Sequence, residues 1–138
     1  MTSGEIRIAI AEACGWREPA NRSNPLYHSP RHIPGQTLAT VDMTQDKDWI
    51  CGFPPGENKL KDLPDYISDL NAMHDVIMVG AEWEGFGFQA LFQLKLQEVV
   101  ERRRSDLNRE QIGWWMNNAT ASQRAEAFLK TIGKWVDP

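Results

Sequence analysis

The segment from Phe86 to Leu96 constrains the fold of this chain more than any other, because its apolar residues alternate with other residues, with Leu91 as the exception. Six apolar residues fall on every second position, namely Phe86, Phe88, Ala90, Phe92, Leu94 and Leu96. A period of two is typical of a strand with one buried face. Gly85 and Gly87 favour the strand further, since each glycine would cost a helix about 1 kcal/mol relative to alanine. We therefore expect a strand here.

A helix is the alternative for the wider stretch from Glu82 to Val100. Gln, Leu, Lys and Glu are good helix formers. Four residues also recur at helical spacing in this stretch, namely Phe88, Phe92, Leu96 and Val99. A helix here would remove the main strand of a layered domain and leave a bundle of helices.

The last fifth of the chain predicts a capped amphipathic helix. Thr120 and Gln123 have the spacing of a capping box, in which the hydroxyl and the carboxamide each bond a free backbone amide. One apolar stripe follows, made of Ala121, Ala125, Phe128, Leu129 and Ile132. Gly133 is suited to the left-handed conformation that ends many helices. We expect the helix to end there.

Two earlier helices are expected from similar signals. Thr2 and Glu5 form another capping box, and Gly15 ends the apolar periodicity that follows it. Pro64 opens the second of these helices and Gly80 closes it. Its apolar stripe has spacings of four, three and four residues and consists of Tyr66, Leu70, Met73 and Ile77.

Short strands are expected at Thr37–Val41, Trp49–Phe53 and Ile112–Met116, where apolar and β-branched residues cluster between turn-forming residues. The stretch from Arg17 to Gly35 contains four prolines and few apolar residues, so we expect an irregular loop. The resulting order is α-β-β-α-β-β-α. This order predicts an α+β fold with a small mixed or antiparallel sheet covered by helices, and the 138 residues are a typical length for a single domain, 1–138.

The composition argues against several classes of protein. The chain has 15 basic and 19 acidic residues, a net charge of −4, which argues against general nucleic-acid binding and membrane-surface binding. No apolar stretch approaches the roughly 20 residues that span a bilayer, and no secretion signal is recognisable. The two cysteines, Cys14 and Cys51, are therefore expected to be reduced thiols in a cytoplasmic protein.

Three parts of the sequence resemble the phage ABA-sandwich domain family: Leu63–His74, Ala119–Leu129 and Gly133–Trp135. The resemblance implies a small protein of a bacteriophage or prophage, made in the bacterial cytoplasm, with a three-layer α-β-α sandwich fold. It supplies no catalytic residues. Many small phage proteins act by binding, including to host immunity proteins or their nucleotide messengers, although a fold does not determine a function.

Three polar residues are candidates for ligand binding. Asn71 and His74 are three residues apart and share a helical face, and Arg124 lies near the positive end of the last helix, where it could meet an anion. Each also has a structural explanation, as a hydrogen-bonded or solvated side chain at the edge of the core. His28 and His32 have Pro30 between them, so they are not expected to share a helical face or bind metal.

The adjacent Trp114 and Trp115 are candidates for an interface. On a strand they would point to opposite faces, so one of them would be available for a homodimer contact. We find no catalytic motif, metal set or cofactor motif. The sequence hypothesis is a non-enzymatic phage accessory protein that binds a host protein or a small ligand. The alternatives are a small nucleotide-handling hydrolase that uses His74 and Arg124, or a virion assembly component.

Overall fold

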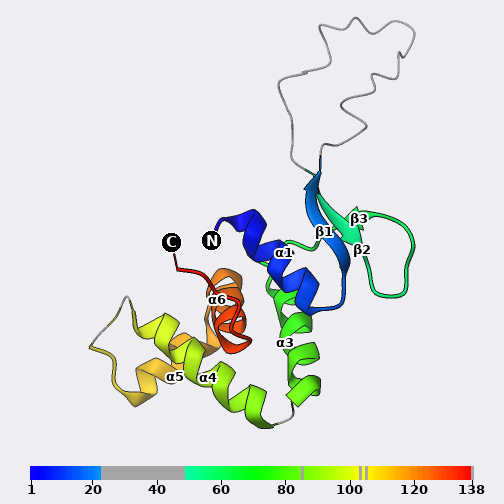
Figure 1. Cartoon of the computed structure of the whole chain (residues 1–138). Helices are drawn as coiled ribbons and strands as arrows, with labels where there is room; N and C mark the ends of the chain where they lie inside the picture. Colours follow the sequence, from blue (N-terminus) through cyan, green and yellow to red (C-terminus); the bar gives the residue numbers. More distant parts are fainter. Residues whose placement is uncertain (23–48, 85, 103, 105, 138) are drawn as a thin grey trace, which may run out of the picture.

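The computed structural model describes residues 1–22, 49–84, 86–102, 104 and 106–137. In these residues it has five α-helices and one three-stranded antiparallel sheet (Figure 1). An α+β fold is therefore confirmed. The elements in chain order are α1 (Ser3–Ala13), β1 (Arg17–Arg22), β2 (Trp49–Phe53), β3 (Lys61–Asp62), α3 (Leu70–Glu84), α4 (Phe86–Glu101), α5 (Arg109–Asn117) and α6 (Ala121–Thr131).

The first and last helices begin and end as predicted. Thr2 with Glu5 and Thr120 with Gln123 form complete capping boxes, each with two reciprocal hydrogen bonds. Gly15 and Gly133 follow these helices with φ angles of 86° and 72°, the left-handed conformation that glycine adopts most easily.

The expected strand from Phe86 to Leu96 is wrong, because α4 covers the whole segment. The helical stripe is the buried one: Phe88, Phe92, Leu96 and Val99 are at most 5% exposed. Ala90 and Leu94, which a strand would have buried with them, lie at the surface. Gly87 lies in the first turn of α4, where its cost to the helix is small, and Gly85 lies outside the described residues.

The expected strand at Ile112–Met116 is also a helix, α5. Asn108 caps α5 and forms a capping box with Gln111. It is the same kind of signal as the capping boxes at Thr2 and Thr120, which were predicted from the sequence. Because both later strands are helices, the predicted order α-β-β-α-β-β-α is wrong for the described elements. Figure 1 shows the sheet at one end of the molecule, beside α1, rather than between two layers of helices.

The sheet has the order β1-β2-β3, and both neighbouring pairs are antiparallel. The strand at Trp49–Phe53 is confirmed. Arg17–Arg22, expected to start the irregular loop, instead pairs with it, and the register shifts between Arg17 and Ala20. The rest of that loop and the expected strand Thr37–Val41 lie outside the described residues.

Helix α3 begins later and ends later than predicted. Asp69 precedes it and accepts a hydrogen bond from the backbone amide of Asn71 at 2.9 Å, which satisfies a free amide of the first turn. The helix continues through Gly80 to Glu84. Tyr66, which we placed on the helix, lies before it and is buried.

Helix α6 lies at the centre of the core. Its residues Ala125, Ala127, Phe128 and Leu129 are at most 1% exposed, and the helix packs against α1, α3 and α4. Helices α3 and α4 diverge from the corner where one ends and the other begins, and Figure 1 shows α6 between them. This arrangement leaves a groove, described next.

Candidate functional site

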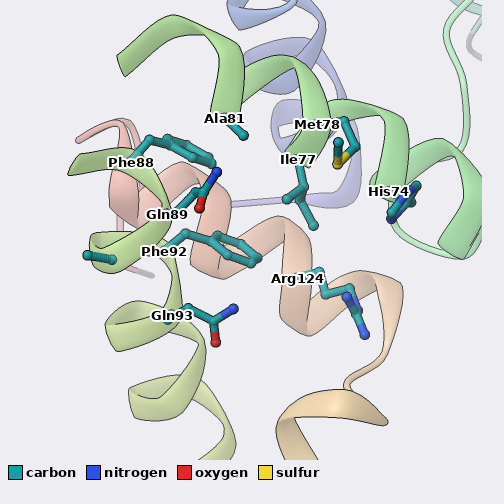
Figure 2. Close-up of a pocket in the computed structure, with 10 residues that line it drawn as sticks. His74, Ile77, Met78, Ala81, Phe88, Gln89, Phe92, Gln93 and Arg124 are labelled. Carbon is teal, nitrogen blue, oxygen red and sulfur yellow. The ribbon is translucent and has the colours of Figure 1, made fainter. Parts of the chain in front are cut away.

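A surface groove with a cavity volume of about 620 Å³ lies between α3 and α4, with α6 beneath it (Figure 2). Three helices contribute its lining, which consists of His74, Ile77, Met78, Ala81, Phe88, Gln89, Ala90, Phe92, Gln93 and Arg124. It is the strongest candidate for a binding site in the part of the chain that the structure describes.

The α3 wall consists of four residues on one helical face, His74, Ile77, Met78 and Ala81. Their spacings of three, one and three residues place them along about two turns of the helix. Met78 is 51% exposed, although methionine is an apolar residue. The α3 wall is therefore apolar over most of its length, with the polar His74 at the end far from the α3–α4 corner.

The α4 wall combines a buried aromatic floor with a polar edge. The rings of Phe88 and Phe92 stack with centroids 5.9 Å apart and an angle of 8° between their planes. Gln89 and Gln93 are one helical turn apart and exposed, and both line the groove. Their carboxamides can donate and accept hydrogen bonds beside the apolar floor.

Arg124 comes from the first turn of α6. Its Nε donates a hydrogen bond to the backbone oxygen of Ala119, and its Nη2 donates one to that of Asn117, both at 3.1 Å. Asn117 is the last residue of α5 and Ala119 lies in the connection that follows, so the guanidinium joins the end of α5 to the start of α6. The two bonds also fix the orientation of the cation at the groove.

The polar groups of the groove are unevenly distributed. In Figure 2, His74 and Arg124 lie at one end, while Ala81 and Phe88 lie at the other. The described lining contains one permanent cation, one histidine and two carboxamides, but no carboxylate. It therefore suits a ligand with an apolar body and a group that accepts hydrogen bonds at one end.

The structure places two of the three predicted ligand-binding residues, His74 and Arg124, in the lining of this groove. Asn71 is exposed on α3 but is not part of the lining. Gln89 and Gln93 were not predicted as site residues, because they face the groove only when their segment is a helix. Their spacing of four residues is the signal that could have identified them.

The two candidate interface residues lie on α5 rather than on a strand. Trp114 is 57% exposed, whereas Trp115 packs against the core. Their rings meet edge to face with centroids 4.8 Å apart, and the guanidinium of Arg104 lies 3.7 Å from the centre of the Trp115 ring. One tryptophan is thus at the surface, as expected, but the reason is a helical face and not the two faces of a strand.

The cysteines are free thiols that lie in different surroundings. Cys51 is buried in β2, and Cys14 follows α1. Burial raises the pKa of the Cys14 thiol to about 11, and burial likewise raises the pKa of the neighbouring Tyr66. Cys14 is therefore a protonated, unreactive thiol at neutral pH.

Two further observations bear on the class of protein. Among the described residues, no three His, Cys, Asp or Glu side chains form a cluster that could hold a metal ion. Among the described helices, none combines the length and the apolar character that a bilayer crossing needs.

Comparison with models of protein families, with curated proteins and with solved structures finds no significant match to this chain. The resemblance to the phage ABA-sandwich domain family therefore stays a prediction from the sequence. The order of the described elements is not the α-β-β-α-β-β-α order that we predicted from the sequence pattern.

Proposed function

We propose that this protein is a non-enzymatic binding protein that holds a small, largely apolar ligand in the α3–α4 groove. The observation that carries the proposal is the groove itself, in which α3 and α4 present apolar side chains and α6 presents Arg124 around a volume of about 620 Å³. Sites for small ligands and cofactors commonly measure about 300–1,000 Å³ and have this mixture of apolar walls and few polar groups.

The side chains of the groove support binding rather than a purely structural role. Met78 is half exposed, and a flexible, polarizable thioether adapts to ligands of varied shape. Phe92 supplies a ring face from the floor, and Gln93 supplies hydrogen-bonding groups beside it. A ligand would cover apolar surface that water now contacts, which is the main source of affinity in such sites.

The biological setting of the proposal comes from the sequence resemblance alone. It is that of a phage or prophage accessory protein in the bacterial cytoplasm, and the ligand is then a small molecule of the host cell. The exposed Trp114 of α5 adds a homodimer contact to the proposal, on a helix separate from those that line the groove.

A nucleotide-handling hydrolase is the second candidate, because His74 and Arg124 line the same groove. An imidazole and a guanidinium at one end of a groove could act on a phosphate ester as a base and an anion-binding group. A screen of nucleotide turnover with wild type and His74→Ala separates the two functions. Turnover that disappears in His74→Ala would favour the hydrolase.

The binding proposal is tested with 2-naphthamide, a neutral probe with an apolar body, in a titration followed by ¹H–¹⁵N correlation NMR. We expect saturable shifts of the amide signals of Ala81, Gln89 and Gln93. Met78→Gln should weaken binding about fourfold, since each methylene group that is no longer covered is worth about 0.8 kcal/mol.

Leu94→Gln is the matched control, because Leu94 is 57% exposed on α4 but lies outside the groove lining. It should leave the affinity for 2-naphthamide unchanged. Shifts that appear elsewhere in the protein, or equal affinities of Met78→Gln and wild type, would contradict the proposal.

A further inference from the structure

We propose that the ligand of the groove carries a carboxylate, and that the outer edge of the Arg124 guanidinium binds it with two parallel hydrogen bonds. This inference rests on the proposed function, because it names the chemical class of the ligand for the same site. It follows from the way in which Arg124 is held.

The two backbone hydrogen bonds of Arg124 occupy one edge of its guanidinium. Nε and Nη2 point to the same side of the planar group, and the oxygens of Ala119 and Asn117 accept from them at 3.1 Å. Within the part of the chain that the structure describes, these are the hydrogen bonds of the group. A guanidinium has five N–H donors, so three remain: one of Nη2 and one of Nη1 lie side by side on the outer edge, and the second N–H of Nη1 points back toward Cδ.

That outer edge matches the two oxygens of a carboxylate. Two parallel N–H groups and two coplanar oxygens form the bidentate pair that is typical of arginine recognition. The orientation of Arg124 is already fixed in the folded protein by the connection between α5 and α6. Binding therefore loses little further side-chain entropy, which is the advantage of a preorganised site.

The charge of the groove favours a carboxylate over a phosphate. Arg124 is the one permanent cation in the described lining, so it can neutralise a single negative charge. A phosphate monoester carries nearly two negative charges at neutral pH and has three acceptor oxygens. The two glutamines of the lining, Gln89 and Gln93, carry uncharged carboxamides that can solvate a carboxylate without adding charge.

The polarity gradient along the groove gives the ligand a direction. Its apolar body would lie toward Ala81 and Phe88, and its carboxylate would lie toward Arg124 and His74 (Figure 2). An aromatic or aliphatic carboxylic acid has this arrangement of groups.

The test compares 2-naphthoate with 2-naphthamide, which share shape and apolar body and differ mainly in charge. We expect wild type to bind 2-naphthoate about tenfold more tightly than the amide, as befits a charge-assisted bidentate pair. Arg124→Lys keeps the charge but lacks the planar fork. It should reduce the ratio to about twofold, while the affinity for 2-naphthamide changes little.

Arg109→Lys is the matched control, because Arg109 is an exposed arginine at the start of α5 and lies outside the groove. It should preserve the tenfold ratio. Should Arg124→Lys fail to fold, the NMR signals of Nε and Nη of Arg124 in the wild-type protein provide the test instead. The Nη signals should shift with 2-naphthoate and stay in place with 2-naphthamide.

The outcomes separate the two proposals. Equal affinities for the two probes, or a ratio that persists in Arg124→Lys, would overturn the carboxylate inference and leave the groove as a binding site for neutral apolar ligands. Tighter binding of 2-naphthyl phosphate than of 2-naphthoate would also overturn it. Failure of both naphthalene probes to bind would remove the proposed function together with the inference.

Discussion

The ring of Phe88 occupies the space into which a side chain at Gly80 would project. A Cβ atom at Gly80 would lie 2.6 Å from Cζ and 2.9 Å from Cε2 of that ring. The ring has little freedom to move, because its centroid lies 5.9 Å from those of both Phe92 and Phe128. The absence of a side chain at Gly80 therefore sets how closely α3 approaches α4 near the corner between the two helices.

Gly80→Ala should destabilise the protein, although alanine favours helices. Overpacking of a core typically costs about 1–3 kcal/mol, and the gain in helix propensity is about 1 kcal/mol. We expect a net loss of about 1 kcal/mol in the free energy of unfolding, measured with urea. Gly113→Ala is the control, because Gly113 lies within α5 and a Cβ there would meet no atom within 4 Å.

Gly113→Ala should stabilise the protein by about 0.5–1 kcal/mol. Because Gly80→Ala should lower stability and Gly113→Ala should raise it, the pair separates crowding against Phe88 from the helix propensity of alanine. A smaller residue at position 88 should then relieve the crowding, so that Gly80→Ala and Phe88→Leu together cost less than the sum of the two single changes. Equal stabilisation by both glycine substitutions would contradict this account.

Glu126→Gln should have a lower free energy of unfolding than wild type at neutral pH. The difference between the two proteins should become smaller at acid pH. Glu126 is buried on α6 and accepts hydrogen bonds from Arg102 at 2.6 and 3.0 Å, while the amine of Lys130 lies 2.9 Å away. Burial alone would raise the pKa of the Glu126 carboxyl, but the two cations outweigh it and the net pKa is lowered from the ordinary value of 4.5.

The direction of this pH dependence follows from the lowered pKa of the Glu126 carboxyl. The stabilisation is complete above pH 4.5 and is lost as the pH falls below that value, because the unfolded chain then takes up the proton first. We expect Glu126→Gln to lose about 1–3 kcal/mol at pH 7. The difference from wild type should shrink in denaturation curves below pH 4.5. Glu98→Gln, which breaks an exposed pair with Lys95, should change stability by less than about 1 kcal/mol.

Cys14 should react slowly with iodoacetamide at pH 8 in the folded protein. With a pKa of about 11, roughly one thiol in a thousand is ionised at that pH, and the thiolate is the reactive species. The pKa is raised above the ordinary 9.0, so this group should also reduce stability as the pH rises from 9 to 11. Peptide mapping by mass spectrometry measures the rate, with the urea-unfolded chain as reference. A folded-state rate equal to the unfolded one would refute the burial of this thiol.

Trp114→Gln and Trp115→Gln should differ in their effect on stability. Trp114 is 57% exposed, so its replacement should change the free energy of unfolding by about 0.5 kcal/mol or less. Trp115 packs against the core and under Arg104, and its loss should cost about 1–3 kcal/mol. Light scattering of wild type and Trp114→Gln at high concentration tests the homodimer contact. A wild-type monomer would reject it.

The elements that could be predicted are those with complete local signals. The boxes at Thr2 and Thr120 fix the starts of α1 and α6, and the glycines at positions 15 and 133 follow their ends. These signals depend on a few adjacent residues and on backbone geometry. They therefore do not require knowledge of what the helix packs against.

Helix α4 could not be predicted in this way, because its apolar residues fit both the two-residue period of a strand and the three-to-four-residue spacing of a helix. Phe88, Phe92 and Leu96 belong to the strand pattern and to the helical stripe alike. The choice depends on the neighbouring surface: α4 packs along α6, where Ala121 and Ala125 are buried small residues that permit close approach. That surface comes from residues much later in the chain, so a local pattern does not contain it.

The candidate site was predictable only in part for the same reason. Both His74 and Arg124 stand out as polar residues beside an apolar stripe, and each lies on an element that was recognised as a helix. Their presence at one groove depends on how α3 and α6 pack. The roles of Gln89 and Gln93 depend on α4, the element whose type the sequence left open.

The central position of α6 has a consequence for the order in which the protein can mature. Synthesis delivers α1, α3 and α4 before the residues of α6 that fill the space between them. Until the ribosome has released this last helix, Phe88 lacks its partner Phe128 and remains open to chaperones or to other nascent chains. A polypeptide truncated before Ala121 would therefore lose the groove between α3 and α4 and leave its aromatic floor uncovered.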